Sequence, residues 1–440
     1  IGGVADQSSN GAFTLLQGRV ALGGGNRRPC WRRGRTGGNE EQRQEGSHGR
    51  NHGRSQSPWE EDPVIDQICH DTNQLIGGNP DSCLLIDETG IPKKGPKSVG
   101  VSRQYCGQLG KVDNCQVGVF AVIAHNKYVA PIDCRLYLPK AWIDDQQRCE
   151  QAGVPEEFIE YQRKQDLALQ LVIAARLRGA QFNWVGCDAF YGEDPAFVRF
   201  LDDMGETFMA DVHKDQRIYL DNPSPFVPAR KSKKGRPPTR LKARCKTIRV
   251  DRWVQQQPES AWTAMDVRNT TKGKLKVAVL HRRVWLWDGK ESKARYWHLI
   301  VRKTLANKEI KYSLSNAAHQ TPVKRLVYMQ GQRYLIERIF QDAKNQCGMG
   351  QYQARGWRSW HHHMTMAMMA MLFMLEQQIK YSADHPLLSG NDIVELLTHY
   401  LPNRKISEEE VFRQLQVRHQ KRQLAIDSAY RKQSYEDPSP

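Results

Sequence analysis

The sequence has no paired cysteine motif, no long apolar run and no excess of acidic residues. Its ten cysteines are scattered singly, without a Cys-x-x-Cys pair, which argues against a disulfide framework or a zinc site. The longest apolar run, from Met364 to Leu375, is interrupted by Thr365 and is too short to span a bilayer. The first residues also lack the basic and apolar segments of a signal peptide. We therefore expect a cytoplasmic protein with no membrane partner.

Positive charge is what the chain has in abundance. Its 440 residues include 65 Lys and Arg but only 48 Asp and Glu, which gives a formal net charge of +17. The basic residues are spread through the chain, and this distribution favours a polyanionic partner. Nucleic acid is the first candidate, which would place the protein at the nucleoid, and a membrane surface is the weaker alternative.

Changes in composition divide the chain into six segments. Residues 1–56 are rich in Gly, Arg, Asn, Gln and Ser, and we expect either a disordered basic arm or a misread segment. The other five are the first part of a core with mixed strands and helices (57–222), a basic Pro-rich linker (223–248), a β-rich insertion (249–316), a helical completion of the core (317–380) and a charged helical tail (381–440).

Hydrophobic periodicity places the elements within these segments. It predicts helices over 63–76, 155–179, 333–344 and 357–379. It predicts strands over 83–87, 116–124, 128–138, 182–188, 274–280, 283–287, 296–302 and 311–315. Asp288-Gly289 is a typical hairpin turn between two of the last four strands.

The linker carries a dense run of cations. Pro237-Pro238 cannot continue a helix, so the run is predicted to be a loop. Charge runs are often merely solvated, but one this dense in an already basic chain favours contact with DNA phosphates. The candidate phosphate-binding residues are Arg230, Lys233, Lys234, Arg236 and Arg240.

Three acids are candidate ligands for a metal. Asp87 and Asp188 each end an apolar strand run, and Glu337 lies on the polar face of the helix 333–344 together with Arg333 and Lys344. Acids at the ends of neighbouring strands meet at one sheet edge, where a helix can add a third. Such a set suits Mg²⁺ or Mn²⁺, and two ions can promote displacement at phosphorus. Taken singly, each Asp could instead cap a turn or helix, and the helix could be an ordinary surface helix.

These residues resemble the DDE transposases of bacterial insertion sequences that have a β-rich insertion between the second Asp and the Glu. Arg333, Glu337 and Lys344 match the Arg-x3-Glu-x6-Lys signature, whereas Gln330 replaces the usual Tyr before the Arg. The likeness covers about residues 60–380. Its other motifs are Leu85-Ile-Asp87-Glu-Thr-Gly90, Lys93-Lys-Gly, Ser98-Val-Gly-Val, Gly186-Cys-Asp188-Ala-Phe-Tyr-Gly192 and Gly235-Arg-Pro-Pro.

The resemblance implies an α/β fold, a ribonuclease-H-like mixed sheet with flanking helices and an inserted all-β subdomain. Asp87, Asp188 and Glu337 would be the catalytic metal ligands, and Arg333 and Lys344 would bind phosphates near the scissile bond. The implied reaction is cut-and-paste transposition: water frees a 3′-hydroxyl at the transposon end, and this hydroxyl attacks target DNA. The implied partners are double-stranded DNA, as terminal inverted repeats and target, and a second copy of the chain.

Aromatic and histidine residues add weaker predictions. Trp285, Trp287 and Trp297 are candidates for stacking on a base flipped out of the duplex, although alternating Trp residues in strands also pack in cores. His361-His-His363 cannot all bind one ion because consecutive helical residues point in different directions, and we expect backbone contact with DNA instead.

Two other functions stay open. One is a catalytically disabled relative that binds DNA without an N-terminal end-recognition domain. The other is a metal-dependent DNA nuclease that cleaves without joining strands.

Overall fold

The computed structural model describes residues 59–230, 236, 238–270, 273–305, 309–401 and 407–436. The chain divides into two units, Ile1–Asn51 and His52–Pro440, and all of the described residues belong to the second. The expected N-terminal arm or misread segment, and the candidates Lys233 and Lys234, lie outside the described residues.

Twelve strands and twelve α-helices are named within these ranges. The strands are β1 (Cys83–Pro92), β2 (Ser102–Cys106), β3 (Lys111–His125), β4 (Tyr128–Leu136), β5 (Val185–Cys187), β6 (Phe208–Val212), β7 (Arg217–Ile218), β8 (Ile248–Arg249), β9 (Thr263–Thr270), β10 (Gly273–Leu286), β11 (Arg295–Thr304) and β12 (Ile310–Ser315). The helices are α2 (Glu61–Ile76), α3 (Lys140–Ile143), α4 (Gln146–Ala152), α5 (Lys164–Leu177), α6 (Ala189–Gly192), α7 (Pro195–Asp203), α8 (Val250–Gln255), α9 (Val323–Gln332), α10 (Tyr334–Gln346), α11 (Trp357–Lys380), α12 (Gly390–Tyr400) and α13 (Glu408–Glu436).

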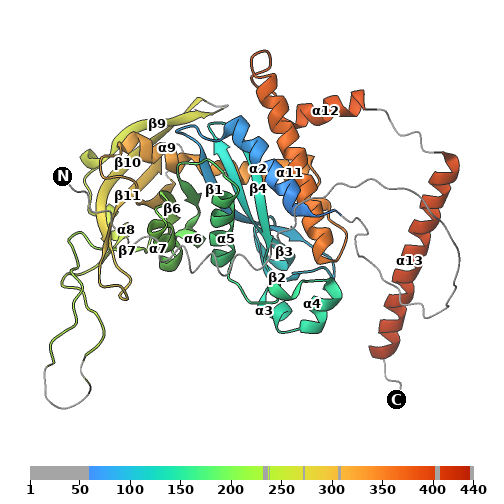
Figure 1. Cartoon of the computed structure of the whole chain (residues 1–440), viewed down its shortest axis with the longest axis horizontal. Coiled ribbons are helices and arrows are strands. Elements are labelled where there is room, and N and C mark those ends of the chain that lie inside the picture. The colour runs from blue at the N-terminus through green and yellow to red at the C-terminus, as the bar shows by residue number, and fades with distance from the viewer. Residues whose placement is uncertain are drawn as a thin grey trace, which may run out of the picture. The chain divides into compact units, whose positions relative to one another are not determined.

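One mixed sheet of ten strands runs through the structure in the order β2-β3-β1-β5-β6-β12-β11-β10-β9, with β4 also paired to β3 (Figure 1). The neighbours β1, β5 and β6 are parallel, and all other pairs in the sheet are antiparallel. Because β12 pairs directly with β6, the predicted β-rich segment extends the same sheet instead of forming a separate one.

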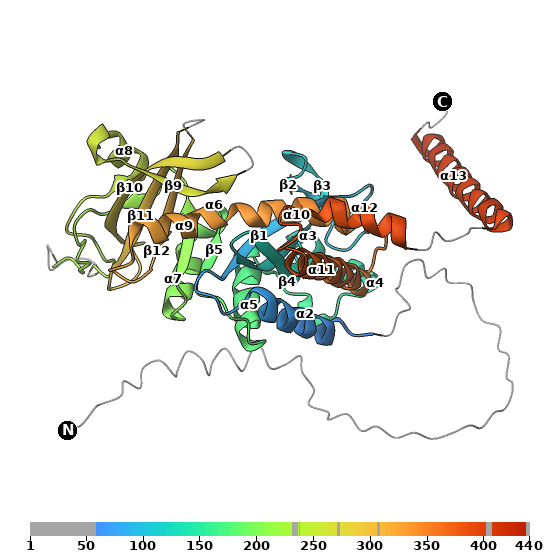
Figure 2. The same cartoon turned by 90° about the horizontal axis from the view of Figure 1, so that it is seen from above.

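Helices pack on both faces of this sheet. The residues of β1 alternate between the faces, so Leu85 packs in one core cluster with Ile336 of α10, and Ile86 packs in the other with Leu171 of α5. The helices α9 and α10 follow one another along the first face (Figure 2). The predicted fold class, a mixed α/β sheet with flanking helices, is confirmed. Every helix in the described ranges is too short or too polar to cross a lipid bilayer.

Some element boundaries differ from the sequence prediction. The two strands expected over 274–280 and 283–287 are one strand, β10, because residues 277–286 pair without interruption with β11. The helix expected over 155–179 begins only at Lys164, where the backbone N–H of the N-cap residue Arg163 donates to Asp166 Oδ2 at 2.9 Å.

Candidate active site

Three aspartates lie side by side at the point where the parallel pairing of β1, β5 and β6 ends. Ile86 of β1 pairs with Cys187 of β5, and Cys187 pairs in turn with Ala210 of β6. The residue that follows each of these three is an aspartate, namely Asp87, Asp188 and Asp211. The first two are the predicted pair, whereas Asp211 was not singled out from the sequence.

Asp188 also begins a helix. Its Oδ1 accepts hydrogen bonds from the backbone N–H groups of Phe190, at 3.0 Å, and Tyr191, at 3.4 Å. Asp188 is therefore the N-cap of α6, the role that the sequence left open, and this cap fixes its carboxylate at the end of β5.

Arg333 connects α9 and α10 to two of these aspartates. It lies between α9 and α10, and its guanidinium donates through Nη2 to Glu337 Oε1 at 2.6 Å and through Nε to Asp211 Oδ2 at 3.0 Å. Its Nη1 lies 3.7 Å from Asp87 Oδ2. The Arg333 side chain is 16% exposed, whereas Glu337 is 58% exposed. One half-buried cation thus contacts acids from β1, β6 and α10.

Negative charge is concentrated around Asp87 and Asp188. Burial raises the pKa of Asp87 well above its ordinary value, and the charges of Asp188 and Glu88 raise it further. Burial, and then the charge of Glu88, raise the pKa of Asp188 to about 6. Arg333 opposes both shifts because its positive charge favours the ionised carboxylates. The site therefore disfavours having all of its acids charged at once.

Glu88 faces the opposite side of the sheet from Asp87. Its carboxylate accepts hydrogen bonds from Tyr191 Oη at 2.5 Å and from Lys164 Nζ at 2.9 Å. These contacts join β1 to α5 and α6 immediately beside the aspartates. Glu88 was not predicted from the sequence, although its place directly after Asp87 in the Asp-Glu-Thr-Gly motif was a usable signal.

Lys344 lies further along β1. Its Nζ donates to the backbone oxygen of Gly90 at 3.1 Å, and burial lowers the pKa of its ammonium group. The signature helix α10 thus places Arg333 and Lys344 at two points along the strand that carries Asp87. Their binding to phosphates stays a prediction.

The basic linker is exposed where the structure describes it. Arg230, Arg236 and Arg240 are all exposed to solvent. A β-bridge between Phe226 and Lys242 brings the two ends of this segment together. The described residues from 223 to 247 contain no helix, and the contact of this segment with DNA stays a prediction.

The three tryptophan candidates have different environments. Trp297 is 5% exposed and packs edge-on against Phe208, so neither ring face is open to a base and it is removed from the candidates. Trp285 is partly exposed but stacks on Tyr296, with ring centroids 4.5 Å apart. Trp287 is also partly exposed.

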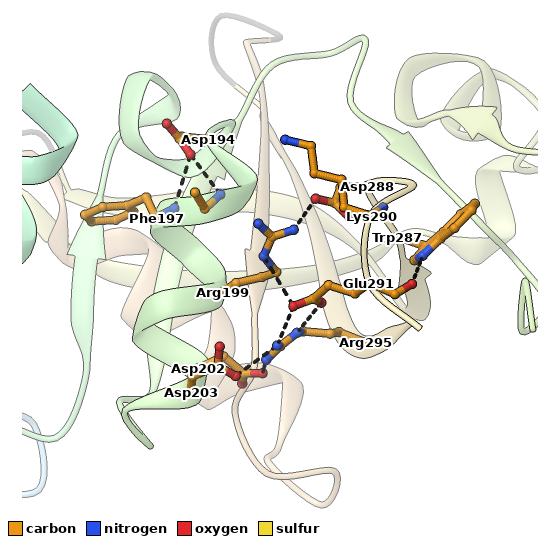
Figure 3. A network of polar contacts seen from close by, with 11 residues as sticks. Asp194, Phe197, Arg199, Asp202, Asp203, Trp287, Asp288, Lys290, Glu291 and Arg295 are labelled. Carbon is orange, nitrogen blue, oxygen red and sulfur yellow. Dashed lines mark hydrogen bonds and ion pairs between the residues drawn. The ribbon is translucent and has the colours of Figure 1, made fainter. Parts of the chain in front are cut away.

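The loop that carries Trp287 is held by ion pairs (Figure 3). Trp287 Nε1 donates to the backbone oxygen of Glu291 at 2.7 Å. Arg199 of α7 forms an ion pair with Asp288 in the same loop, and Arg295 of β11 forms ion pairs with Asp202 and with Asp203, the latter at 2.9 Å. This network fixes the β10–β11 loop against α7.

Two of the three histidines in the run, His361 and His362, are not available to DNA. His361 and His362 are buried, and the ring of His362 stacks on Trp59 with centroids 3.9 Å apart. Trp360 beside them is fully buried. The prediction of backbone contact with DNA is therefore wrong for these residues, because their side chains pack in the core.

Comparison with known proteins agrees with this arrangement. A family model described as "DDE superfamily endonuclease" matches residues 42–274, just over half of the chain. The chain belongs to this family. It is also 30% identical over 181 residues to the "Probable transposase for insertion sequence element IS701" of Microchaete diplosiphon, a match that covers 40% of this chain and 43% of that protein. The chain thus aligns with less than half of the length of this relative, and the resemblance to insertion-sequence DDE transposases is confirmed.

The donor set of this DDE endonuclease suits a divalent metal in part. No group of three His, Cys, Asp or Glu side chains that could hold an ion is found among the described residues. Mg²⁺ often binds through one or two carboxylates and the phosphates of a substrate, however, and Asp87 and Asp188 are two neighbouring carboxylates of the kind that it prefers. Their raised pKa values reflect burial first and then crowding of negative charge, and a divalent cation would relieve the crowding. In this structure Glu337 contacts Arg333, and it lies beyond the region that the DDE family model matches.

Proposed function

We propose that this DDE endonuclease is the transposase of an insertion sequence. It would cleave DNA at the ends of the element and transfer the freed 3′-hydroxyl into target DNA by cut-and-paste transposition. The observation that carries the proposal is the placement of Asp87 and Asp188 side by side, with Arg333 contacting both Asp87 and Glu337 of the signature helix. The family match and the name of the IS701 relative support it.

The acids would hold the metal. Asp87, Asp188 and Glu337 are the proposed ligands for Mg²⁺ or Mn²⁺. When bound, two such ions would activate the attacking oxygen and stabilise the leaving oxygen. The cap that Asp188 makes on α6 keeps its Oδ1 engaged with backbone N–H groups, so Oδ2 is the oxygen it can offer.

The cations would position the DNA. Arg333 lowers the net negative charge around the aspartates, which reduces the repulsion of an approaching phosphate. Lys344 offers a second positive charge along β1, and the exposed arginines 230, 236 and 240 would contact the DNA backbone at longer range. Trp287 remains a candidate for base stacking because the ion-pair network fixes its loop.

The proposed partners are double-stranded DNA and a second copy of the chain. A transposase must process two element ends together, so two active sites in one DNA complex are expected. We therefore propose a homodimer in the complex with terminal inverted repeats and target DNA.

The test is Mg²⁺-dependent cleavage and strand transfer on DNA that carries the element's own ends. Glu337→Gln keeps the shape of the side chain but removes its charge, and Glu376→Gln on the exposed face of α11 is the matched control. Because substitutions in the outer shell of a metal site already cost about 10- to 100-fold, loss of a direct ligand should reduce cleavage at least about 100-fold. DNA binding should persist in both variants.

Two results would contradict the proposal. If Glu337→Gln cleaves as fast as Glu376→Gln, Glu337 is not a ligand. If the parent chain binds the DNA ends but neither cuts nor joins them, it is a disabled relative.

A second candidate is a DNA nuclease without strand transfer. The description of the family as an endonuclease favours it, because cleavage alone satisfies that description. Joined products between the element end and target DNA in the same assay would exclude this candidate.

A further inference from the structure

Asp211 lies at the centre of a chain of hydrogen bonds that ends at Arg333. Gln330 Nε2 of α9 donates to Ser313 Oγ of β12 at 2.7 Å, and Ser313 Oγ donates to Asp211 Oδ1. The other oxygen, Oδ2, accepts from Arg333 Nε at 3.0 Å. The carboxylate of Asp211 in β6 thus contacts β12 and the residue that follows α9, which lie 102 and 122 positions later in the sequence.

Most of the residues in this series of hydrogen bonds are shielded from water. Ser313 is fully buried, Gln330 is 3% exposed, and the side chain of Asp211 is 15% exposed. A cavity of about 210 Å³ lies beside them, lined in part by Asp211, Gln330 and Arg333. In such surroundings charge-assisted hydrogen bonds are strong and directional, so the orientation of Asp211 is well defined.

The strand register alone would make Asp211 a third metal ligand beside Asp87 and Asp188. Its contacts argue otherwise, because Ser313 occupies one oxygen and Arg333 the other. Asp188, in contrast, uses only Oδ1 in its hydrogen bonds to α6.

The contact with Asp211 also determines where Arg333 points. A guanidinium is a rigid planar fork, so fixing Nε on Asp211 fixes the directions of Nη1 and Nη2. These two nitrogens are the ones that face Asp87 and Glu337. Without Asp211, the guanidinium would be free to move onto those two carboxylates and compete with a metal for them.

We infer that Asp211 is a positioning residue that aims Arg333 across the active site, and that it is not a metal ligand. Ser313 and Gln330 hold Asp211 in turn, so the β-rich part of the sheet takes part in the site through β12. The effect on catalysis rests on the proposed transposase function, whereas the contact and the absence of metal ligation do not.

The first test needs neither DNA nor activity. Thermal unfolding is measured for the full chain, Asp211→Asn, Arg333→Gln and the double variant. If Asp211 acts through Arg333, the Tm shift of the double variant is smaller than the sum of the two single shifts, because either change removes the same contact. Additive shifts would overturn the inference.

The second test is binding of Mn²⁺ to the full chain, to Asp188→Asn and to Asp211→Asn. Asp188→Asn should weaken binding at least about tenfold, and Asp211→Asn should weaken it clearly less. Equal losses in the two variants would make Asp211 a ligand and overturn the inference.

The third test is single-turnover cleavage of DNA ends at saturating Mg²⁺. Asp211→Asn should slow the parent about tenfold but should have no further effect in the Arg333→Gln background. An equal slowing in both backgrounds would overturn the positioning role. If the parent does not cleave at all, the proposed function fails, while the unfolding and Mn²⁺ measurements still decide the role of Asp211.

Discussion

Asp87 and Asp188 stand side by side because the residues before them, Ile86 and Cys187, are paired in neighbouring parallel strands. Burial and the charge of Glu88 raise the pKa of both aspartates, which means that ionising them is unfavourable in the folded protein. Positions arranged for chemistry often have this property. The site is therefore expected to reduce the stability of the fold at neutral pH.

Asp188→Asn tests this expectation. The amide keeps an oxygen to cap α6 but removes the charge that burial and Glu88 disfavour. We expect Tm at pH 7.5 to rise by about 1 °C, because unfolding entropy grows with length and roughly 1 kcal/mol shifts Tm by only about that much in a chain of 440 residues. Thermal unfolding in metal-free buffer measures it, and cleavage should be lost in the same variant.

Asp133→Asn is the matched control for that prediction. Asp133 is equally an aspartate in a buried setting, but it forms ion pairs with Arg135 at 2.7 Å and with Arg178 at 2.6 Å. Removing one partner of a buried pair typically destabilises by about 3–5 kcal/mol. The two substitutions should thus change the stability of the fold in opposite directions, and a loss of stability in Asp188→Asn would contradict our account of the site.

The sequence predicted the two aspartates because each ends an apolar run, a local pattern. It did not predict Asp211, because the importance of that residue depends on long-range pairing of β6 with β5 and β12. Trp297 was wrongly predicted as a stacking candidate, because alternation along a strand does not tell which face of the strand the rest of the chain covers. Local patterns thus identified the elements, and tertiary pairing decided which side chains meet.

Gly192 is a position where a single methyl group should disturb the site. A Cβ at Gly192 would lie 2.0 Å from the backbone oxygen of Asp211 and 3.0 Å from Ala210 Cβ. Gly192→Ala must therefore push α6 away from β6, and we expect a loss of about 1–3 kcal/mol in the free energy of unfolding. Denaturant unfolding measures it. Gly107→Ala is the control, since no described atom beyond its chain neighbours lies within 4 Å of its Cβ, and equal losses would contradict the prediction.

Acid should lower the contribution to stability of two histidines, His361 and His281, whose charged forms the fold disfavours. Burial lowers the pKa of His361 from 6.5 to about 4, and that of His281 similarly to about 4. As the pH falls below about 6.5, the unfolded chain takes up protons that the folded chain cannot, so stability is lost between about pH 6.5 and 4. Above about pH 6.5 this contribution to stability is fully present.

His361→Gln isolates one of these groups. Between pH 7.5 and pH 5 the parent should lose roughly 2 kcal/mol more stability than the variant, from 1.36 kcal/mol per unit of pKa difference. Denaturant unfolding at the two pH values measures the difference. An unchanged acid sensitivity in the variant would show that His361 is already protonated in the fold.

The exposed arginines of the linker should act on DNA through charge alone. Removing one cation that neutralises a phosphate reduces the slope of log K against log[salt] by about 0.9, so the double variant Arg236→Gln, Arg240→Gln should lower it by about two. Because such cations do not read sequence, binding to element ends and to unrelated DNA should weaken together. Arg163→Gln is the control, since Arg163 is already paired with Asp166 at 2.8 Å and Asp194 at 2.6 Å. If the slope changes as much in the control, the effect reflects net charge and the linker does not contact phosphates.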